Sequence, residues 1–182
     1  MEISILFLPL IASIISGFFG KYIGDRNSEI VTSALVSISA LISSFVLYQV
    51  IVNQYEENIV IATWINSGSL DVNWSMLIDP LSAVMLVVVT SISSLVHIYS
   101  IGYMSHDPHK PRFMAYLSLF TFAMLMLVTS DNFMQLFFGW EGVGLCSYFL
   151  IGFWFKKDSA NSAAIKAFVV NRVGDFGFAL GI

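Results

Sequence analysis

Five ionisable side chains lie inside stretches of sequence that are otherwise apolar: His97, Glu141, Lys166, Arg172 and Asp175. A charge removed from water costs free energy unless it is paired, so ionisable residues at such positions are candidates for chemistry before packing. Carboxylates, imidazoles and amines bind and release protons, and a guanidinium can hold a carboxylate in its charged form. The five residues therefore indicate proton transfer within an apolar medium, with Glu141 the strongest candidate.

Glu141 has no ionisable partner three or four residues away on its own helix. Two interpretations of this residue remain open. It is either a neutral, hydrogen-bonded group within the core, or a protonation site whose charge responds to an approaching cation. We favour the second interpretation, because a lone carboxylate in an apolar helix contributes little to packing.

The segments that carry these residues have the composition of a membrane protein. The chain of 182 residues is 57% hydrophobic and 11% charged, with a mean hydropathy of +0.82, whereas a soluble domain is about 25% charged. A helix needs about 20 mostly apolar residues to cross the hydrocarbon core. The sequence therefore predicts an all-α polytopic membrane protein of about six transmembrane helices, at residues 3–23, 30–52, 81–104, 113–129, 133–155 and 163–182.

Basic residues outside the predicted spans alternate from one loop to the next. They follow the first, third and fifth spans and are missing from the loops after the second and fourth: Lys21, Arg26, Lys110, Arg112, Lys156 and Lys157. Positive residues stay on the cytoplasmic or matrix side, so the N-terminus is expected on the outer, periplasmic or intermembrane side. We expect a multi-pass protein of a bacterial inner (plasma) membrane or the mitochondrial inner membrane.

Counting residues from the membrane edge places the charged groups in depth. At a rise of about 1.5 Å per residue, Glu141 lies about 13 Å from the outer edge, and Arg172 lies about 20 Å from the inner edge. In a core about 30 Å thick, the two residues reach similar heights. Asp175 follows Arg172 at a spacing that shares one helix face. Whether Arg172 and Asp175 form only a structural pair or serve proton transfer stays open, as it does for Lys166, which is nearer the inner edge, and for His97.

The one long connection, residues 53–79, joins the second and third spans on the outer side. It contains two β-rich runs around a turn-forming cluster at residues 66–69, which predicts a short β-hairpin. Trp64 and Trp74 flank that turn. They are expected either to anchor the hairpin at the membrane interface or to form a contact surface for a neighbouring subunit.

Other patterns carry weaker signals. The glycines at 139, 142 and 144 are expected to let helices approach closely around Glu141. His106 and His109 lie in a charged loop, where a solvated loop is favoured over a metal site. Nothing in the sequence has the pattern of a phosphate-binding loop, a nucleophile with its base or a nucleic-acid patch. We therefore expect no metal, cofactor or nucleic acid on this chain.

Two blocks of sequence resemble a known family. GWEGVGLCSYFLIGFWF and AAIKAFVVNRVGDFGFALGI, which begin at residues 139 and 163, are similar to the start of the proton-conducting domain of subunit L (chain 5) of NADH:quinone oxidoreductase, respiratory complex I. The segment from residue 79 to residue 128 resembles the N-terminal part of the same subunit. The large subunit of multisubunit sodium/proton antiporters shares this ancestry. The resemblance divides the chain into an N-terminal transmembrane segment, 1–129, and the start of the antiporter-like domain, 130–182.

The resemblance implies roles for the charged residues. The acid of the W-E-G motif, here Glu141, would form an ion pair with a lysine of a seventh helix and pass protons along buried lysines and histidines. Arg172 and Asp175 would be further polar residues of the pathway. NADH, FMN, iron–sulfur clusters and quinone would be bound by partner subunits of the membrane and peripheral arms.

The resemblance also leaves alternatives. The family's subunit has around fourteen or more helices, so we expect this chain to be a fragment, a truncated gene product or one half of a split subunit, completed by further chain or a second polypeptide. A subunit of a cation/proton antiporter and a truncated, non-functional remnant are the competing interpretations.

Overall fold

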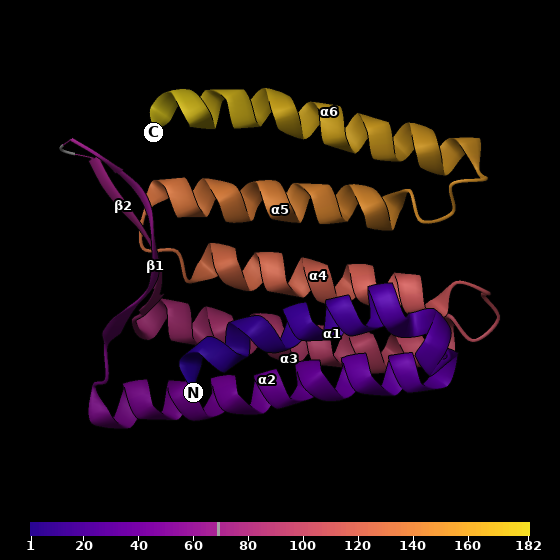
Figure 1. Ribbon diagram of the computed structural model, residues 1–182, viewed down its shortest axis with the longest axis horizontal. Coiled ribbons are helices and arrows are strands. Elements are labelled where there is room, and N and C mark those ends of the chain that lie inside the picture. The colour runs from indigo at the N-terminus through magenta and orange to yellow at the C-terminus, as the bar shows by residue number, and fades with distance from the viewer. Residues whose placement is uncertain (69) are drawn as a thin grey trace.

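A computed structural model describes residues 1–68 and 70–182 of the chain. Over these residues it contains helices that lie side by side, with a two-stranded antiparallel sheet across one end of the bundle (Figure 1). Both termini lie at the same end as the sheet (Figure 1). The elements are α1 (Glu2–Ile23), α2 (Asp25–Asn53), β1 (Glu57–Ser67), β2 (Leu70–Ile78), α3 (Pro80–Tyr103), α4 (Lys110–Val128), α5 (Phe133–Ile151) and α6 (Asp158–Gly181).

The predicted fold class is confirmed. Five helices among the described residues, α1 to α5, are long and apolar enough to cross a membrane. Helix α6 has 24 residues, about 36 Å at about 1.5 Å per residue, but it carries Lys166, Arg172 and Asp175 along its length. The chain is thus a multi-pass membrane protein whose last helix is the most polar of those in the bundle.

Four helix boundaries differ from those predicted by three residues or more: the starts of α2, α4 and α6, which all come earlier in the chain, and the end of α5. Helix α2 begins at Asp25, directly after Gly24, whose φ of 87° makes a one-residue turn from α1 that favours glycine. Its first turn is polar, so the prediction from hydropathy alone placed the start of this span at residue 30. Helix α5 ends at Ile151, four residues early, and Gly152 caps it with its N–H bonded to Tyr148 O.

Helix α4 lies at the centre of the arrangement and packs against α1, α2, α3 and α5. The hydrophobic core fills the half of the bundle next to the hairpin, where side chains of α1 to α4 meet those of β2; they include Ile5, Leu6, Val46, Met76, Ile78, Leu86 and Leu125. Helix α6 packs against α5 at the edge of the bundle. Its other face exposes Val169, Val173 and Phe176.

Glycines bring α5 close to α4, as predicted. A Cβ atom on Gly139 would lie 2.8 Å from the backbone N and Cα of Leu127, and one on Gly142 would lie 3.2 Å from the Cβ of Ala123. Close approach requires glycine at Gly139, because the obstructing atoms belong to the backbone of α4 and cannot rotate away. Gly144 faces α6 with room to spare, since its added Cβ would lie 3.9 Å from Asn171 Nδ2.

We expect Gly139→Ala to lower the free energy of unfolding by about 1–3 kcal/mol, because the added methyl group forces α4 and α5 apart. Thermal unfolding of the purified full-length protein in detergent measures this change. Gly142→Ala should have a smaller effect, and Gly102→Ala should have almost none, since nothing lies within 4 Å of a Cβ at that position. Equal losses in all three variants would contradict the close contact at Gly139.

The predicted hairpin is present, with Glu57 paired to Ile78 and Ser67 to Leu70 at its two ends. Ser69 of the predicted turn cluster lies outside the described residues. The rings of Trp64 and Trp74 lie 5.0 Å apart and 6.0 and 4.8 Å from that of Phe138 on α5. The two tryptophans therefore pack on the N-terminal part of α5, a contact within the chain that the sequence did not predict.

Candidate functional site: a charged cluster between α5 and α6

The hairpin holds the N-terminal end of α5 in place. The side-chain amide of Gln135, which is 1% exposed, accepts from Ser75 N at 3.0 Å and donates to Ser75 O at 2.6 Å. Asn132 caps the helix by accepting from Gln135 N at 2.9 Å, and it donates to Asn73 O at the same distance. Glu141 follows six residues after Gln135, about 9 Å further along the axis. The position of Glu141 is thus set by a helix whose start is fixed.

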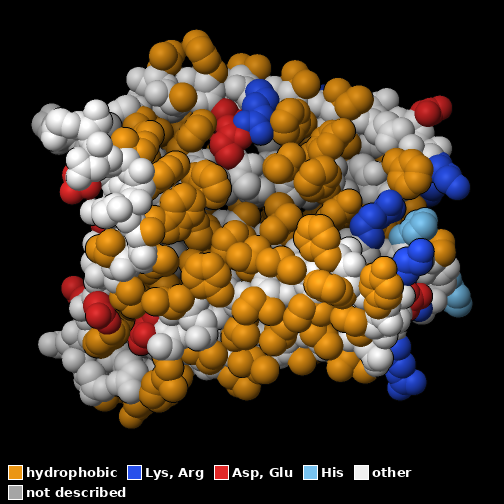
Figure 2. Space-filling view, viewed as in Figure 1, with side chains coloured by type: hydrophobic (Ala, Val, Ile, Leu, Met, Phe, Trp, Pro, Cys, Tyr) orange, Lys and Arg blue, Asp and Glu red, His pale blue; other side chains and the backbone are white. Residues whose placement is uncertain are grey.

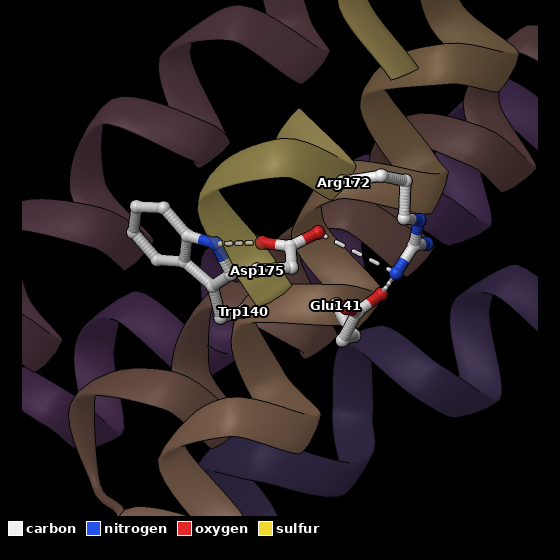
Figure 3. Close-up of polar contacts among 4 residues, drawn as sticks. All are labelled: Trp140, Glu141, Arg172 and Asp175. Carbon is white, nitrogen blue, oxygen red and sulfur yellow. Dashed lines mark hydrogen bonds and ion pairs between the residues drawn. The ribbon is translucent and has the colours of Figure 1, made fainter. Parts of the chain in front are cut away.

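Glu141 and Arg172 form an ion pair between α5 and α6 (Figure 3). The same nitrogen of Arg172, Nη1, lies 3.5 Å from Asp175 Oδ2. Asp175 Oδ1 accepts a hydrogen bond of 2.9 Å from the indole of Trp140, the residue before Glu141 (Figure 3). Four residues from two neighbouring helices therefore form one continuous polar cluster, and the equal depth predicted for Glu141 and Arg172 is confirmed.

The cluster lies among apolar side chains. Figure 2 shows a group of acidic and basic side chains surrounded by hydrophobic ones over α6. The Asp175 side chain is 9% exposed and that of Glu141 22%, whereas Arg172 is 40% exposed and lies with its Cζ 4.5 Å from the centre of the Phe168 ring. The two carboxylates are therefore more shielded from water than the guanidinium that they share.

The charges of the cluster do not balance. Two carboxylates share one guanidinium, so one negative charge is left when both acids are ionised. The cluster can then bind one proton or pair with one more cation, and either event weakens the ion pair between Arg172 and one of the carboxylates. A groove of about 400 Å³ next to Asp175, lined by Leu136, Trp140, Val170, Asn171, Gly174 and Phe178, has room for water.

The other two predicted residues lie apart from this cluster. His97 is fully buried between α3 and α4, where Nδ1 lies 2.8 Å from Ser93 O and Nε2 lies 3.0 Å from Ser118 Oγ. Both ring nitrogens are thus paired, which is the geometry of a satisfied core residue, and α4 lies between this histidine and the α5–α6 cluster. Lys166 is exposed on α6 and has no ion pair with any described residue. A relay role for either residue stays a prediction.

Sequence reasoning missed two residues. Trp140 precedes Glu141, and an indole N–H inside an apolar helix needs a hydrogen-bond acceptor, which was a signal for its bond to Asp175. Glu29 is only 5% exposed near the start of α2, with its Oε1 4.0 Å from Lys110 Nζ. It escaped notice because the predicted span began one residue later.

The bundle of membrane helices that carries this charged cluster belongs to an antiporter-like class of membrane subunit, as comparison with known families shows. A family model described as "NADH:quinone oxidoreductase/Mrp antiporter, TM" matches residues 130–182. A second, described as "NADH-Ubiquinone oxidoreductase (complex I), chain 5 N-terminus", matches residues 64–114. The chain belongs to the chain 5 (subunit L) family of NADH:quinone oxidoreductases, of which it corresponds to the N-terminal part.

Individual relatives agree with this family. The chain is 58% identical over 182 residues to NADH-ubiquinone oxidoreductase chain 5 of Arabidopsis thaliana, covering 100% of this chain and 27% of that protein. It is 54% identical over 189 residues to NADH-quinone oxidoreductase subunit L of Rhodobacter capsulatus, covering 26% of it. The chain thus spans about a quarter of the length of these relatives. A chain in the structure of the archaeal membrane-bound sulfane sulfur reductase shares the fold, with a TM-score of 0.80 at 19% identity over 100% of this chain and 36% of that one.

Proposed function

We propose that this chain is part of a membrane-arm subunit of NADH:quinone oxidoreductase and that it serves proton translocation coupled to electron transfer from NADH to quinone. The observation that carries the proposal is the Glu141–Arg172 ion pair between two membrane helices, with Asp175 as a second acid on the same guanidinium. A carboxylate in such a setting exchanges protons when its cation moves, which is what a proton relay requires.

Each residue of the cluster has a separate part in this proposal. Glu141 is the group that binds and releases the proton. Arg172 stabilises its ionised form, and Asp175 offers Arg172 an alternative partner 3.5 Å away. A lysine from a further helix, as the family resemblance implies, would supply the positive charge that the cluster lacks.

The surroundings of the chain are part of the same proposal. NADH, FMN, iron–sulfur clusters and quinone would be held by partner subunits, and the membrane would be a bacterial or mitochondrial inner membrane. Residues 130–182 would begin the antiporter-like domain and residues 1–129 would precede it, a division supported by the separate matches of the two family models.

The distribution of charge supports an outer N-terminus. Lys and Arg side chains gather at the end of the bundle where α1–α2, α3–α4 and α5–α6 connect, and acidic side chains gather at the hairpin end (Figure 2). Basic residues favour the cytoplasmic or matrix side. The hairpin would therefore lie on the outer side.

A cation/proton antiporter subunit is the second candidate function. The description of the model matching residues 130–182 names the Mrp antiporter beside the oxidoreductase, and a carboxylate with one unbalanced charge suits a sodium ion as well as a proton.

Purification of the full-length protein from its native membrane separates the two functions. We expect the purified assembly to oxidise NADH, reduce quinone and move protons when reconstituted in vesicles. Sodium-driven proton movement by an assembly that lacks redox subunits would overturn the first proposal in favour of the second.

A further inference from the structure

Arg112, in the first turn of α4, is a cation without an acidic partner. Its side chain is half-buried, and Nη2 donates to Phe153 O at 3.2 Å. Its Nε is buried without a hydrogen-bond partner, and no described carboxylate lies within ion-pair distance. The guanidinium lies 4.7 and 5.3 Å from the ring centres of Phe153 and Phe155. Aromatic rings hold it in place without neutralising it.

Two hollows share Arg112 and Tyr116 as lining residues. One, of about 480 Å³, lies between α1 and α4 and is also lined by Lys21, His109 and Asp25. The other, of about 380 Å³, lies among α4, α5 and α6 and is walled mainly by aromatic and aliphatic side chains: Tyr148, Phe149, Phe153, Phe155, Ala164 and Ile165. Asp25 offsets one positive charge, so Lys21 and Arg112 together leave this region positive.

The position of Arg112 suits one kind of anion. Arg112 lies in the first turn of α4, and α4 begins at the end of the bundle opposite the hairpin (Figure 1), where basic side chains gather (Figure 2). Basic pockets between membrane helices on this side bind anionic lipid headgroups, and guanidinium matches phosphate oxygens with two parallel N–H donors. The aromatic wall of the second hollow provides an apolar surface for acyl chains.

We propose that Arg112 binds the phosphate of an anionic phospholipid, whose headgroup lies in the hollow beside Lys21 and whose chains lie against the aromatic wall. A free phosphate ion would offer the same oxygens, but it has no apolar part that could contact the aromatic wall. None of these residues belongs to the Glu141 cluster, so the proposal stands apart from proton translocation.

Lipid analysis of the full-length protein in its purified assembly tests this site. We expect the wild type to retain anionic phospholipid through detergent exchange, and Arg112→Gln to retain roughly fivefold to tenfold less, since one charged contact near the surface is lost. Arg26→Gln is the matched control, because Arg26 is basic, at the same end and lines neither hollow. Equal retention by Arg112→Gln and the wild type would overturn the proposal.

Two further measurements keep the test independent of how well the variant folds. A photoreactive phosphatidylglycerol should label wild-type peptides that contain residues 108–116 and 148–165, whereas a phosphatidylcholine probe should label them weakly. Inorganic phosphate should not displace the lipid. Labelling confined to other regions would refute the site, and so would displacement of the lipid by phosphate. An ion pair between Arg112 and a carboxylate from the remainder of the full-length protein would refute it as well.

Discussion

Replacing Glu141 with glutamine is expected to abolish most proton translocation by the assembled oxidoreductase. Glutamine keeps the size and hydrogen-bonding reach of the side chain but cannot exchange a proton. Losing an acid–base group from a transfer step typically slows it by roughly a hundredfold or more. The measurement is the number of protons moved per NADH oxidised, by a pH-sensitive dye in vesicles, together with the rate of quinone reduction.

Matched variants make this result specific. Glu141→Asp keeps the carboxylate on a shorter side chain, so it should retain part of the activity. Lys157→Ala, a change at an exposed site beside the start of α6, should leave pumping unchanged. If Glu141→Gln and the wild type pump with the same stoichiometry, Glu141 is not the protonation site.

Arg172→Leu has the second large effect. It leaves Glu141 and Asp175 without their shared cation, so two acids remain in an apolar setting. Removing one partner of a buried pair costs about 3–5 kcal/mol, and we expect about 2–3 kcal/mol here because the Arg172 side chain is 40% exposed. The midpoint of thermal unfolding in lipid nanodiscs measures the change, and proton translocation should fall in parallel.

A second substitution distinguishes charge from packing. Arg172→Leu combined with Asp175→Asn removes one unpaired negative charge, so the double variant should recover part of the lost stability. If the losses of stability caused by Asp175→Asn and by Arg172→Leu simply add, with no coupling free energy between them, the three side chains do not act as one electrostatic unit.

The sequence predicted the bundle well because length and hydropathy decide which segments cross a membrane. It also predicted that Glu141 and Arg172 reach similar heights, since the rise per residue is the same in every α-helix and depth follows from counting. Counting residues along a helix gives the height of a side chain but not the direction in which it points around the helix axis. The bond from Trp140 to Asp175 and the bond from Ser118 to His97 depend on how neighbouring helices are turned about their axes, and packing decides that.

Polar segments next to the membrane were harder to interpret. Glu29 lies just after the first turn of α2, in a segment that is too hydrophilic for a hydropathy window, yet the one-residue turn at Gly24 carries that segment straight into the bundle. The packing of Trp64 and Trp74 on Phe138 joins residues more than sixty positions apart, and no local pattern encodes such a contact.

The attachment of Gln135 to both backbone groups of Ser75 limits how the charged cluster can change state. A translation of α5 along its axis would break both hydrogen bonds at a site that is 1% exposed, where no water could replace them. The hairpin end of α5 is therefore held in position along the helix axis. If Glu141 gains or loses a proton as proposed, we expect rotation of side chains, above all of the Arg172 guanidinium between its two acids, to accommodate the change while α5 itself stays still.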